Sequence, residues 1–291
     1  MKILLLGSQG QLGATLAEVL ADEHDLTTRS RTQLDVTDQG KVWAYVTTEK
    51  PDVIVNCAAF NDVDGAESEP QKALAVNAFA VQSLAAVATE ICARLIHYSS
   101  DFVFDGEAAS PYAEGNEPNP QGVYATSKLL GEWFAAETPM HYVIRVESLF
   151  GGRFSDREEV ARRGSSLDRL ADDMLNDHAV RAFVDRVVSP SYVVDVANAT
   201  LRLIDVNPAF GIYHCVGSGH ATWFAIVKEL GKQLGLSPIV DPLTLADINL
   251  AARRPKYCAL SNTKLADVGI DMPTWEDAIN RYARRLLLKS S

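Results

Sequence analysis

The chain has 291 residues, enough for one large domain or two smaller ones with a full hydrophobic core. Its formal net charge of −11 argues against a general nucleic-acid-binding or anionic-membrane-binding surface. No apolar run reaches the ~18 residues of a membrane-spanning helix, and the N-terminus has the pattern of a strand rather than a signal peptide. The four cysteines form no C-x-x-C pair and no zinc-like spacing, which fits a reducing compartment. We therefore expect a soluble cytoplasmic protein.

The first predicted element is a short apolar run, Ile3–Leu6, typical of a strand buried on both faces. A helical pattern follows over residues 12–21, so the glycines between them lie in a strand-to-helix turn with the spacing G-x-x-G-x-x-G. Glycine permits the tight turn and the close approach to phosphate, and the helix N-terminus offers free N–H groups. The turn predicts a dinucleotide site; a glycine turn without a ligand is the alternative. The residues expected at the cofactor are Gly7, Gln9, Gly10, Gln11, Leu12 and Gly13.

The residues after the second predicted strand, Asp25–Thr28, are expected to select the cofactor. Arg29 and Arg31 favour the 2′-phosphate of NADPH, whereas an acidic residue at this place is typical of NADH binding. NADH is the alternative cofactor, and the arginines are otherwise solvated loop residues. Asp35, followed by Val36, either approaches the adenine edge or caps the next helix.

The first half of the chain alternates strand-like and helical stretches, which predicts an α/β fold with a doubly wound parallel sheet. The expected strands are Ile3–Leu6, Asp25–Thr28, Val53–Asn56, Leu95–Ser99 and Tyr142–Val146, and the expected helices are Leu12–Ala21, Gly40–Glu49, Pro70–Ile91 and Val123–Ala136. Ligands bind such sheets beyond the carboxyl ends of the strands. Asn56–Ala59, Ser99–Asp101 and Glu147–Ser148 should therefore line one crevice with the glycine turn.

The second half is less regular. Proline and glycine make Ala108–Gln121 a loop, and the charged stretch Phe154–Ser166 is expected to be a solvated insertion or a lid. The later expected elements are helices at Leu167–Leu175, Val193–Ile204, Thr222–Leu234 and from Leu286 to the end, with strands at Val180–Val184 and Gly211–Val216.

Tyr124 and Lys128 are spaced i, i+4, which places a phenol and an ammonium on one face of a helix. A neighbouring cation lowers the pKa of a tyrosine from its usual value of about 10, so this pair predicts acid–base chemistry. Tyr124 would donate a proton to a carbonyl oxygen that is oriented by a hydroxyl group. Ser100 is the candidate for that hydroxyl, and strand alternation places the competing Ser99 on the other face. Asn77 either bonds neighbouring strand backbone or lies on a helix surface.

The glycine turn, the Tyr124–Lys128 pair and Asn56-Cys57-Ala58-Ala59 are similar to the extended short-chain dehydrogenase/reductases. Further motifs along nearly the whole chain resemble the dTDP-4-dehydrorhamnose reductase family. They are Gly10–Gly13, Val63–Pro70, Ser99–Gly106, Pro111-Tyr112, Pro118–Pro120, Val123-Tyr124, Ser189–Tyr192 and Arg253–Pro255.

The resemblance implies NAD(P)H-dependent reduction of the C4 ketone of dTDP-4-dehydro-6-deoxy-L-mannose, which gives dTDP-L-rhamnose for cell-surface polysaccharide. It implies a Rossmann domain over residues 1–147 plus about 185–212, and a smaller C-terminal α/β substrate domain over about 148–184 plus 213–291. Tyr124 is then the proton donor and Lys128 its partner, with Ser100 where the family has threonine. Further implied cofactor contacts are Arg29, Asp35, Val36, Cys57, Ala58, Ala59, Asn77, Ser99, Tyr124 and Lys128.

The substrate contacts that the resemblance implies are Asn61, Ser100, Asp101, Phe102, Tyr124, Glu147, Ser148, Arg253 and Arg254. One of the two arginines would bind the diphosphate, because the guanidinium fork suits phosphate oxygens; a surface pair is the alternative. Some relatives carry an acidic residue on the first helix that supports a metal-bridged dimer. Thr15 lies in that region here, so we expect no metal, although a homodimer is compatible with the sequence.

Three departures from the family pattern cluster on the substrate side. Phe102 replaces a tyrosine, Ser148 replaces a tryptophan, and Glu147 adds a carboxyl group. They do not affect the glycine turn or the Tyr124–Lys128 pair. The sequence therefore supports the reductase chemistry better than it supports the particular sugar. The alternatives are a reductase of another nucleotide-deoxysugar, an epimerase or dehydratase with tightly held NAD, and a non-catalytic NADP-binding regulatory subunit.

Overall fold

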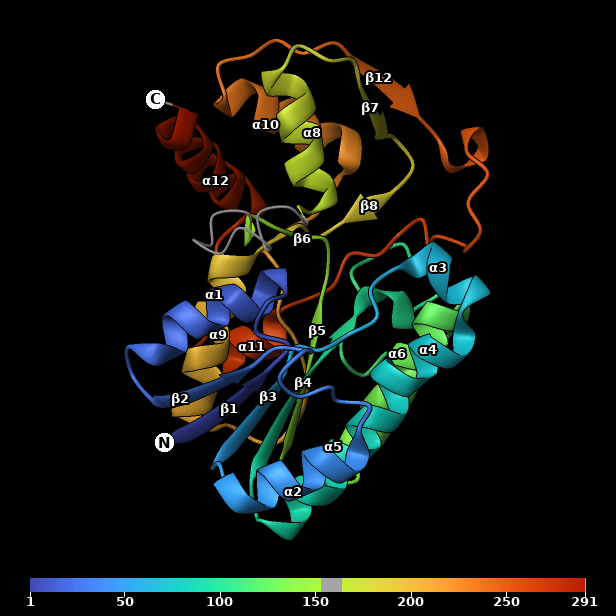
Figure 1. Ribbon diagram of the computed structural model, residues 1–291. Coiled ribbons are helices and arrows are strands. Elements are labelled where there is room, and N and C mark those ends of the chain that lie inside the picture. Colours follow the sequence, from blue (N-terminus) through green and yellow to red (C-terminus); the bar gives the residue numbers. More distant parts are fainter. Residues whose placement is uncertain (153–163, 291) are drawn as a thin grey trace.

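The computed structural model describes residues 1–152 and 164–290, and it has a larger and a smaller lobe (Figure 1). The larger lobe is built on a six-stranded, fully parallel sheet with the order β2-β1-β3-β4-β5-β10. Its strands are β1 (Lys2–Leu6), β2 (Asp25–Arg29), β3 (Val53–Asn56), β4 (Arg94–Ser100), β5 (His141–Val146) and β10 (Gly211–His214). The predicted doubly wound α/β fold is confirmed.

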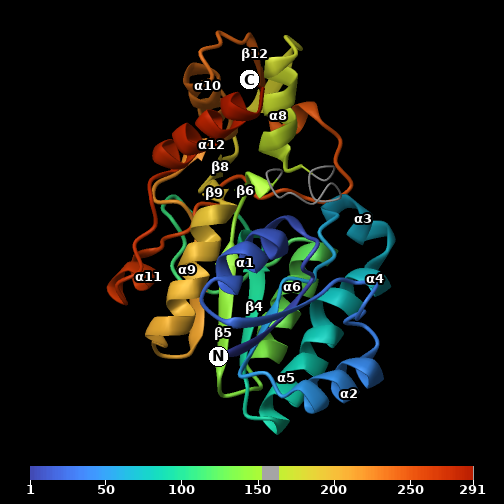
Figure 2. The same cartoon turned by 60° about the vertical axis from the view of Figure 1, so that its left-hand side comes forward.

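The two faces of the sheet bury alternate residues of the same strand. Ile3 and Leu5 pack on one face, and Leu4 and Leu6 pack on the other, because successive side chains of a strand point to opposite sides. The first face is covered by α1 (Gln11–Ala21), α9 (Val193–Val206) and α11 (Thr263–Asp267). The second face is covered by α2 (Gln39–Glu49), α5 (Ala80–Glu90) and α6 (Val123–Ala135), and Figure 2 shows both helical layers.

The predicted helix over residues 70–91 is three elements. A π-helical turn, Ala75–Phe79, separates α4 (Pro70–Leu74) from α5, and the short helix α3 (Val63–Ser68) precedes them. By length and composition the run Pro70–Glu90 is apolar enough to cross a membrane, but half of that stretch is buried inside the molecule. Core helices of globular proteins share this composition, and α5 packs against the central sheet.

The smaller lobe packs three helices against short strands around the buried residues Met174, Ile226, Ile279 and Tyr282. Its helices are α8 (Ser166–Leu175), α10 (Trp223–Gln233) and α12 (Trp275–Ser290), with the short helical turn Leu245–Asp247. Its strands are β7 (Val180–Phe183), β8 (Val187–Val188), β11 (Ala221–Thr222) and β12 (Val240–Leu243). The pair β6 (Leu149–Phe150) and β9 (Ser191–Tyr192) lies where the lobes meet (Figure 2).

One expectation for this lobe was wrong, and one strand was not predicted. The last helix begins at Trp275 and not near Leu286, and β12 was missed. β12 includes Pro242, which is unusual within a strand, and it pairs with β7, which lies far away in the sequence, so no local pattern predicts it. Residues 154–163 of the charged stretch lie outside the described residues. The division into two domains stays a prediction; in the structure β10 and α11 pack with the sheet.

Candidate active site

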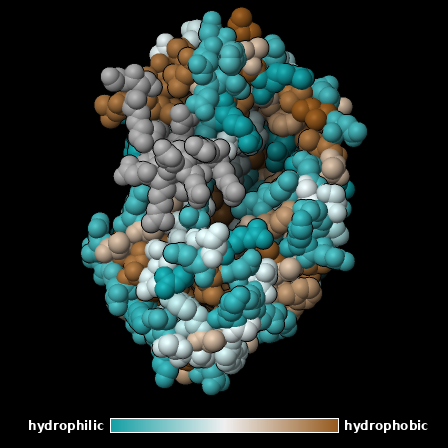
Figure 3. Space-filling view, viewed as in Figure 1, coloured by the Kyte–Doolittle hydropathy of each residue, from teal (hydrophilic) through white to brown (hydrophobic). Residues whose placement is uncertain are grey.

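A cavity of about 640 Å³ lies at the carboxyl ends of β1, β3, β4 and β5. Figure 3 shows the surface hollowed between the two lobes. The sheet register explains the position, because Leu6 pairs with Asn56, Asn56 with His97, and Ser100 with Val146, which aligns the strand ends. The predicted site residues that line the cavity are Gly10, Gln11, Leu12, Gly13, Cys57, Ala58, Ala59, Asn61, Ser99, Ser100, Asp101, Phe102, Tyr124, Lys128, Glu147, Ser148 and Arg254.

The glycine turn has the close contacts that only glycine allows. Gly7 has a φ of 73°, and a Cβ added to it would lie 2.6 Å from the Ala58 nitrogen. A Cβ at Gly13 would lie 2.3 Å from the Gly7 carbonyl oxygen, so this glycine permits α1 to pack on the turn. Gly10 is the N-cap of α1 without a side-chain cap, which leaves N–H groups free for an anion at the cavity. These residues therefore fit a dinucleotide phosphate.

The region after β2 lies away from the cavity. The Arg29 guanidinium lies over the Tyr45 ring at 4.7 Å and donates to the Thr28 carbonyl. Asp35 accepts a hydrogen bond from the Thr37 N–H at 3.0 Å, so it closes a turn, while Asp38 caps α2. The predicted residues outside the cavity lining are Gly7, Gln9, Arg29, Asp35, Val36, Asn77 and Arg253. The Val36 side chain is buried in the core, so only its backbone is available to a ligand.

Tyr124 and Lys128 lie on α6, and both are buried at the cavity. The Lys128 Nζ donates to the Tyr98 carbonyl oxygen at 2.5 Å, and burial lowers the pKa of Lys128 to about 8. The expectation that Lys128 lowers the pKa of Tyr124 was wrong for this structure. Burial and the charge of Asp101 raise the pKa of Tyr124, against a hydrogen bond with Ser100 that lowers it. Tyr124 therefore stays protonated at neutral pH, as a proton donor must.

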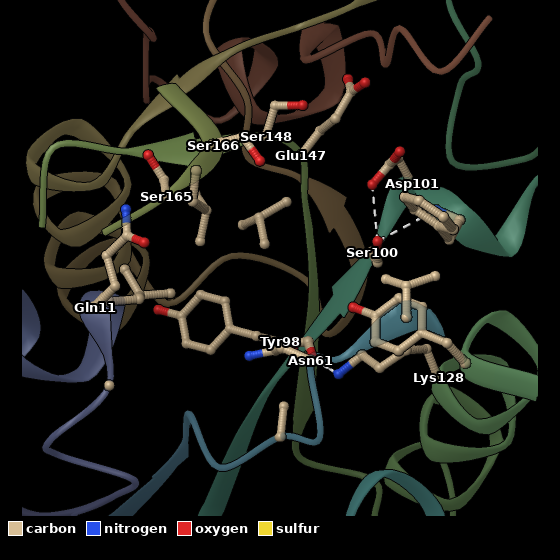
Figure 4. Close-up of a pocket in the computed structure, with 18 of the residues that line it drawn as sticks. Gln11, Asn61, Tyr98, Ser100, Asp101, Lys128, Glu147, Ser148, Ser165 and Ser166 are labelled. Atoms are coloured by element: carbon tan, nitrogen blue, oxygen red, sulfur yellow. Dashed lines mark hydrogen bonds between the residues drawn. The ribbon is translucent and has the colours of Figure 1, made fainter. Parts of the chain in front are cut away.

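Ser100 is the last residue of β4, and its hydroxyl lies close enough to the Tyr124 phenol to lower the pKa of that group. It donates to the Asp101 Oδ1 at 2.8 Å and accepts from the Phe102 N–H at 3.2 Å (Figure 4). Ser99 also lines the cavity, and its buried Oγ has no hydrogen-bond partner among the described residues. The geometry thus favours Ser100 over Ser99 as the hydroxyl beside the proton donor.

Asn77 is fully buried within the π-helical turn, so it is not a helix-surface residue. Its Oδ1 accepts from the Phe60 N–H at 2.8 Å, and its Nδ2 donates to the Phe60 carbonyl at 3.0 Å and to the Ser127 Oγ at 3.0 Å. These bonds join the loop after β3 to α6. Asn77 therefore organises the site from behind the cavity, and a direct contact with the cofactor stays a prediction.

A buried ion pair fixes α6 against β5. The Arg145 guanidinium donates two bonds to the Glu132 carboxylate, at 2.8 and 2.7 Å, and both side chains are almost fully buried. The same guanidinium contacts His214 at 3.3 Å and lies over the Phe104 ring at 4.9 Å. Sequence reasoning missed this pair, because the two residues lie on different elements and in no motif.

The two candidate arginines for a diphosphate lie in different places. Arg254 lines the cavity, where it bonds Asp64 at 2.6 Å and lies 5.9 Å from the Phe102 ring. Arg253 is outside the lining and contacts Gln121 and Glu107 instead, so its predicted substrate contact is not supported.

The smaller lobe supplies lining residues that sequence reasoning missed. Arg169, Arg186 and Trp223 all line the cavity, and the buried Trp223 Nε1 has no hydrogen-bond partner within residues 1–152 and 164–290. Ser165 and Ser166, at the start of α8, lie on the same side of the cavity as Gln11 (Figure 4). These residues are far apart in the sequence and belong to no motif. The packing of the two lobes brings them to the cavity, so no local pattern could predict them.

The three departures from the family pattern all lie at the cavity. Phe102 packs edge-on against Tyr124, with ring centroids 5.6 Å apart. Ser148 has a φ of 44°, in the left-handed region where non-glycine residues are uncommon and often functional. The buried Glu147 accepts from the Ser189 N–H at 2.7 Å, and its Oε1 has no partner among the described residues. Glu147 therefore faces the pocket and is not held in a salt bridge behind it.

Comparison with known proteins agrees with this geometry. The family model described as the RmlD substrate binding domain matches residues 1–288. The dTDP-4-dehydrorhamnose reductase of Mycobacterium tuberculosis is 34% identical over 287 residues, covering 96% of this chain and 91% of the relative. The chain belongs to the dTDP-4-dehydrorhamnose reductase (RmlD) family.

Solved structures of this reductase family superpose on nearly the whole chain. The dTDP-4-dehydrorhamnose reductase structure from Clostridium acetobutylicum has a TM-score of 0.91 at 31% identity, covering 99% of this chain and 100% of that one. The Bacillus anthracis structure, which is a complex with NADP, has a TM-score of 0.90 at 28% identity, covering 97% and 99%. The recognition made from the sequence motifs is confirmed.

Proposed function

We propose that this protein is an NADPH-dependent reductase that converts the C4 ketone of dTDP-4-dehydrorhamnose to the alcohol of dTDP-L-rhamnose. The observation that carries the proposal is the protonated Tyr124, beside Ser100 and one helical turn from Lys128, at the carboxyl edge of the parallel sheet. Family membership and the NADP complex of the Bacillus anthracis relative support the same activity and cofactor.

The chain's own residues explain the proton transfer. Ser100 and Tyr124 orient the ketone oxygen, and Tyr124 gives it a proton as the carbonyl is reduced. The Lys128 Nζ lies one helical turn further along α6, held by the Tyr98 carbonyl at the cavity, where it is placed to bind the cofactor. Asn77 and the Arg145–Glu132 pair hold α6 in place, so the distances between these groups are set before substrate binds.

The cofactor would lie along the glycine turn, Gly7–Gly13, and across the ends of β3 and β4. Bound NADPH would supply the hydride. Cys57, Ala58 and Ala59 present the loop after β3 to it, and Gln11 has a buried Nε2 with no partner among the described residues. Arg29 would reach the 2′-phosphate only by leaving the Tyr45 ring, so the preference for NADPH over NADH stays a prediction.

The nucleotide-sugar would occupy the side of the cavity toward the smaller lobe. Arg186 and Arg254 are the lining cations suited to the diphosphate, and Trp223 offers a ring and an N–H group. A cytoplasmic location and a homodimer are further parts of this proposal. The net charge of −11 gives no support for a nucleic-acid partner.

The test is NADPH oxidation at 340 nm with enzymatically generated dTDP-4-dehydrorhamnose, comparing the wild type with Tyr124→Phe. We expect rapid oxidation by the wild type and a loss of at least about 10²-fold in kcat in the variant, with NADPH affinity nearly intact, because Phe lacks the transferable proton. Near-wild-type turnover by Tyr124→Phe would remove the proton-donor assignment.

The altered substrate side favours one second candidate, a reductase of another nucleotide-deoxysugar ketone. Phe102, Glu147 and Ser148 all line the cavity, so they can change which sugar fits. If the wild type binds NADPH without oxidising it in the presence of dTDP-4-dehydrorhamnose, other nucleotide-sugar ketones should be assayed. Isolation of a stable heteromer without turnover would instead favour a regulatory subunit.

A further inference from the structure

Asp101 and Glu147 form a buried pair of carboxyl groups beside the proton donor. Their oxygens and the Cys258 Sγ lie within 4.8 Å of one another, and the two acids are 4% and 1% exposed. Two carboxylates this close in a buried site strongly disfavour double ionisation, so one of them retains a proton. The labels in Figure 4 show Glu147 and Asp101 at the same end of the cavity, next to Ser100.

The surrounding charges do not neutralise both acids. The groups that face the pair are Ser100 from β4, Tyr124 from α6, Arg186 before β8, and Tyr257 and Cys258 before α11. Arg186 is a cation that acts on both acids and lowers the pKa of each. Burial nevertheless raises the pKa of Asp101 to about 6 and the pKa of Glu147 well above its usual range.

Hydrogen bonds connect this pair to the reaction centre. The Ser100 hydroxyl donates to the Asp101 Oδ1 at 2.8 Å and also lies close enough to the Tyr124 phenol to affect its pKa. The Glu147 Oε2 accepts from the Ser189 N–H, which fixes the carboxyl group, while its Oε1 is buried without a partner among the described residues. A path of adjacent polar atoms therefore runs from the acid pair through Ser100 to Tyr124.

We propose that Asp101 and Glu147 share one proton and deliver it through Ser100 to Tyr124 after each reduction. This inference rests on the proposed function. Tyr124 gives its proton to the ketone oxygen and becomes a phenolate; the Ser100 O–H proton then moves to the phenolate as the acid pair gives its proton to the Ser100 oxygen. The pair is left with one additional negative charge and takes a proton from water after the product leaves.

A shared proton suits this site better than a metal ion. The positive charge of Arg186 acts on the same two carboxyl groups, and burial raises the pKa of Cys258, which keeps it a thiol. A divalent cation would have to overcome both effects, since metal binding requires a thiolate and carboxylates. A proton binds without a thiolate. It also neutralises the one negative charge that remains when Arg186 offsets one of the two carboxylates.

The first experiment is stopped-flow NADPH oxidation by the Glu147→Gln variant. The amide keeps the size of the side chain and an acceptor for the Ser189 N–H, but it removes the second acid. The first turnover uses the proton already on Tyr124, so at saturating nucleotide-sugar we expect it to lose much less rate than the turnovers that follow. Steady-state turnover at pH 8 should fall on the order of tenfold, and this deficit should shrink as the pH falls, because an acidic medium protonates Asp101 directly.

Cys258→Ala is the matched control, because it changes the third member of the cluster without removing an acid. We expect its first turnover and its steady-state rate to equal those of the wild type. Equal losses in the first and later turnovers of Glu147→Gln would overturn the proposal. So would a steady-state deficit of this variant that stays constant between pH 6 and pH 9, or the same two-phase defect in Cys258→Ala.

Infrared spectroscopy provides a readout that does not depend on turnover. At pH 7 the wild type should show the C=O absorption of a protonated carboxyl group that Glu147→Gln lacks. If the wild type lacks this absorption, the proposal that the two acids share a proton is refuted, whatever the kinetics show. A wild type that has this absorption but reduces no nucleotide-sugar would refute the proposed function and leave the acid pair established.

Discussion

The two sides of the cavity treat buried charge differently. On the α6 side each buried charge has a close partner: Lys128 bonds the Tyr98 carbonyl, and Arg145 bonds Glu132 twice. On the opposite side Asp101 and Glu147 face one another, and their pKa values are raised despite Arg186. The first arrangement fixes the geometry of the proton donor, whereas the second stores a proton and responds to pH.

The same two sides also differ in proposed function. The residues for cofactor binding and proton transfer lie on one side of the cavity, and those that select the substrate lie on the other. The glycine turn and the Tyr124–Lys128 pair keep the family pattern, while Phe102, Glu147 and Ser148 depart from it on the other side. A change on the α6 side should therefore affect stability or the proton transfer itself. A change on the acid side should affect the substrate and the pH dependence.

The largest expected effect comes from breaking the buried ion pair with Glu132→Gln. Removing one partner leaves the Arg145 charge buried and uncompensated, which should lower the free energy of unfolding by about 3–5 kcal/mol. Urea denaturation would measure the change. Lys72→Gln, which breaks the exposed Lys72–Glu69 pair, is the control and should cost less than about 1 kcal/mol. Equal losses in the two variants would show that the α6 side does not depend on this pair.

The next effect tests the glycine turn. In Gly13→Ala the added methyl would lie 2.3 Å from the Gly7 carbonyl oxygen, so α1 must shift, at a cost of about 1–3 kcal/mol, and NADPH should bind more weakly. Gly115→Ala is the matched control, because nothing lies within 4 Å of the added atom. Calorimetric titration with NADPH and thermal denaturation would check both variants; unchanged NADPH affinity in Gly13→Ala would contradict the placement of the cofactor at this turn.

Adjacent arginines provide a smaller test on the substrate side. Arg254 lines the cavity and Arg253 does not, so Arg254→Gln should raise the KM for the nucleotide-sugar about tenfold while Arg253→Gln leaves it unchanged. Steady-state kinetics with varied substrate would distinguish the two. A larger effect from Arg253→Gln would mean that substrate binding reorganises this segment.

The smallest effect is the pH dependence of stability. Folding raises the pKa of Asp101 to about 6 and also raises the pKa of Glu147, so the folded protein retains protons that the unfolded chain releases above about pH 4. These acids therefore stabilise the fold less as the pH rises. Glu147→Gln should be more stable than the wild type at pH 8, and the difference should disappear near pH 4. Urea denaturation at both pH values would check it; a constant difference would mean that the effect is packing rather than ionisation.

Much of the larger lobe was predictable, because its signals are local. Alternating apolar strands and periodic helices gave five of the six sheet strands within one residue at either end, as Val53–Asn56 and His141–Val146 illustrate. The glycine spacing and the i, i+4 pair at Tyr124 and Lys128 predicted residues that line the cavity for the same reason. The smaller lobe was less predictable, since β12 and the start of α12 depend on partners far away in the sequence.

The sequence by itself determined which groups exist: a glycine turn, a tyrosine with a lysine one turn away, a serine beside a strand end, and an unusual glutamate at position 147. Only the tertiary structure decided how they act. Burial and neighbouring charge keep Tyr124 protonated, direct Lys128 to a backbone carbonyl, select Arg254 over Arg253, and bring Asp101 together with Glu147. A pKa depends on the dielectric surroundings and on charges that are distant in sequence, which no spacing of residues encodes.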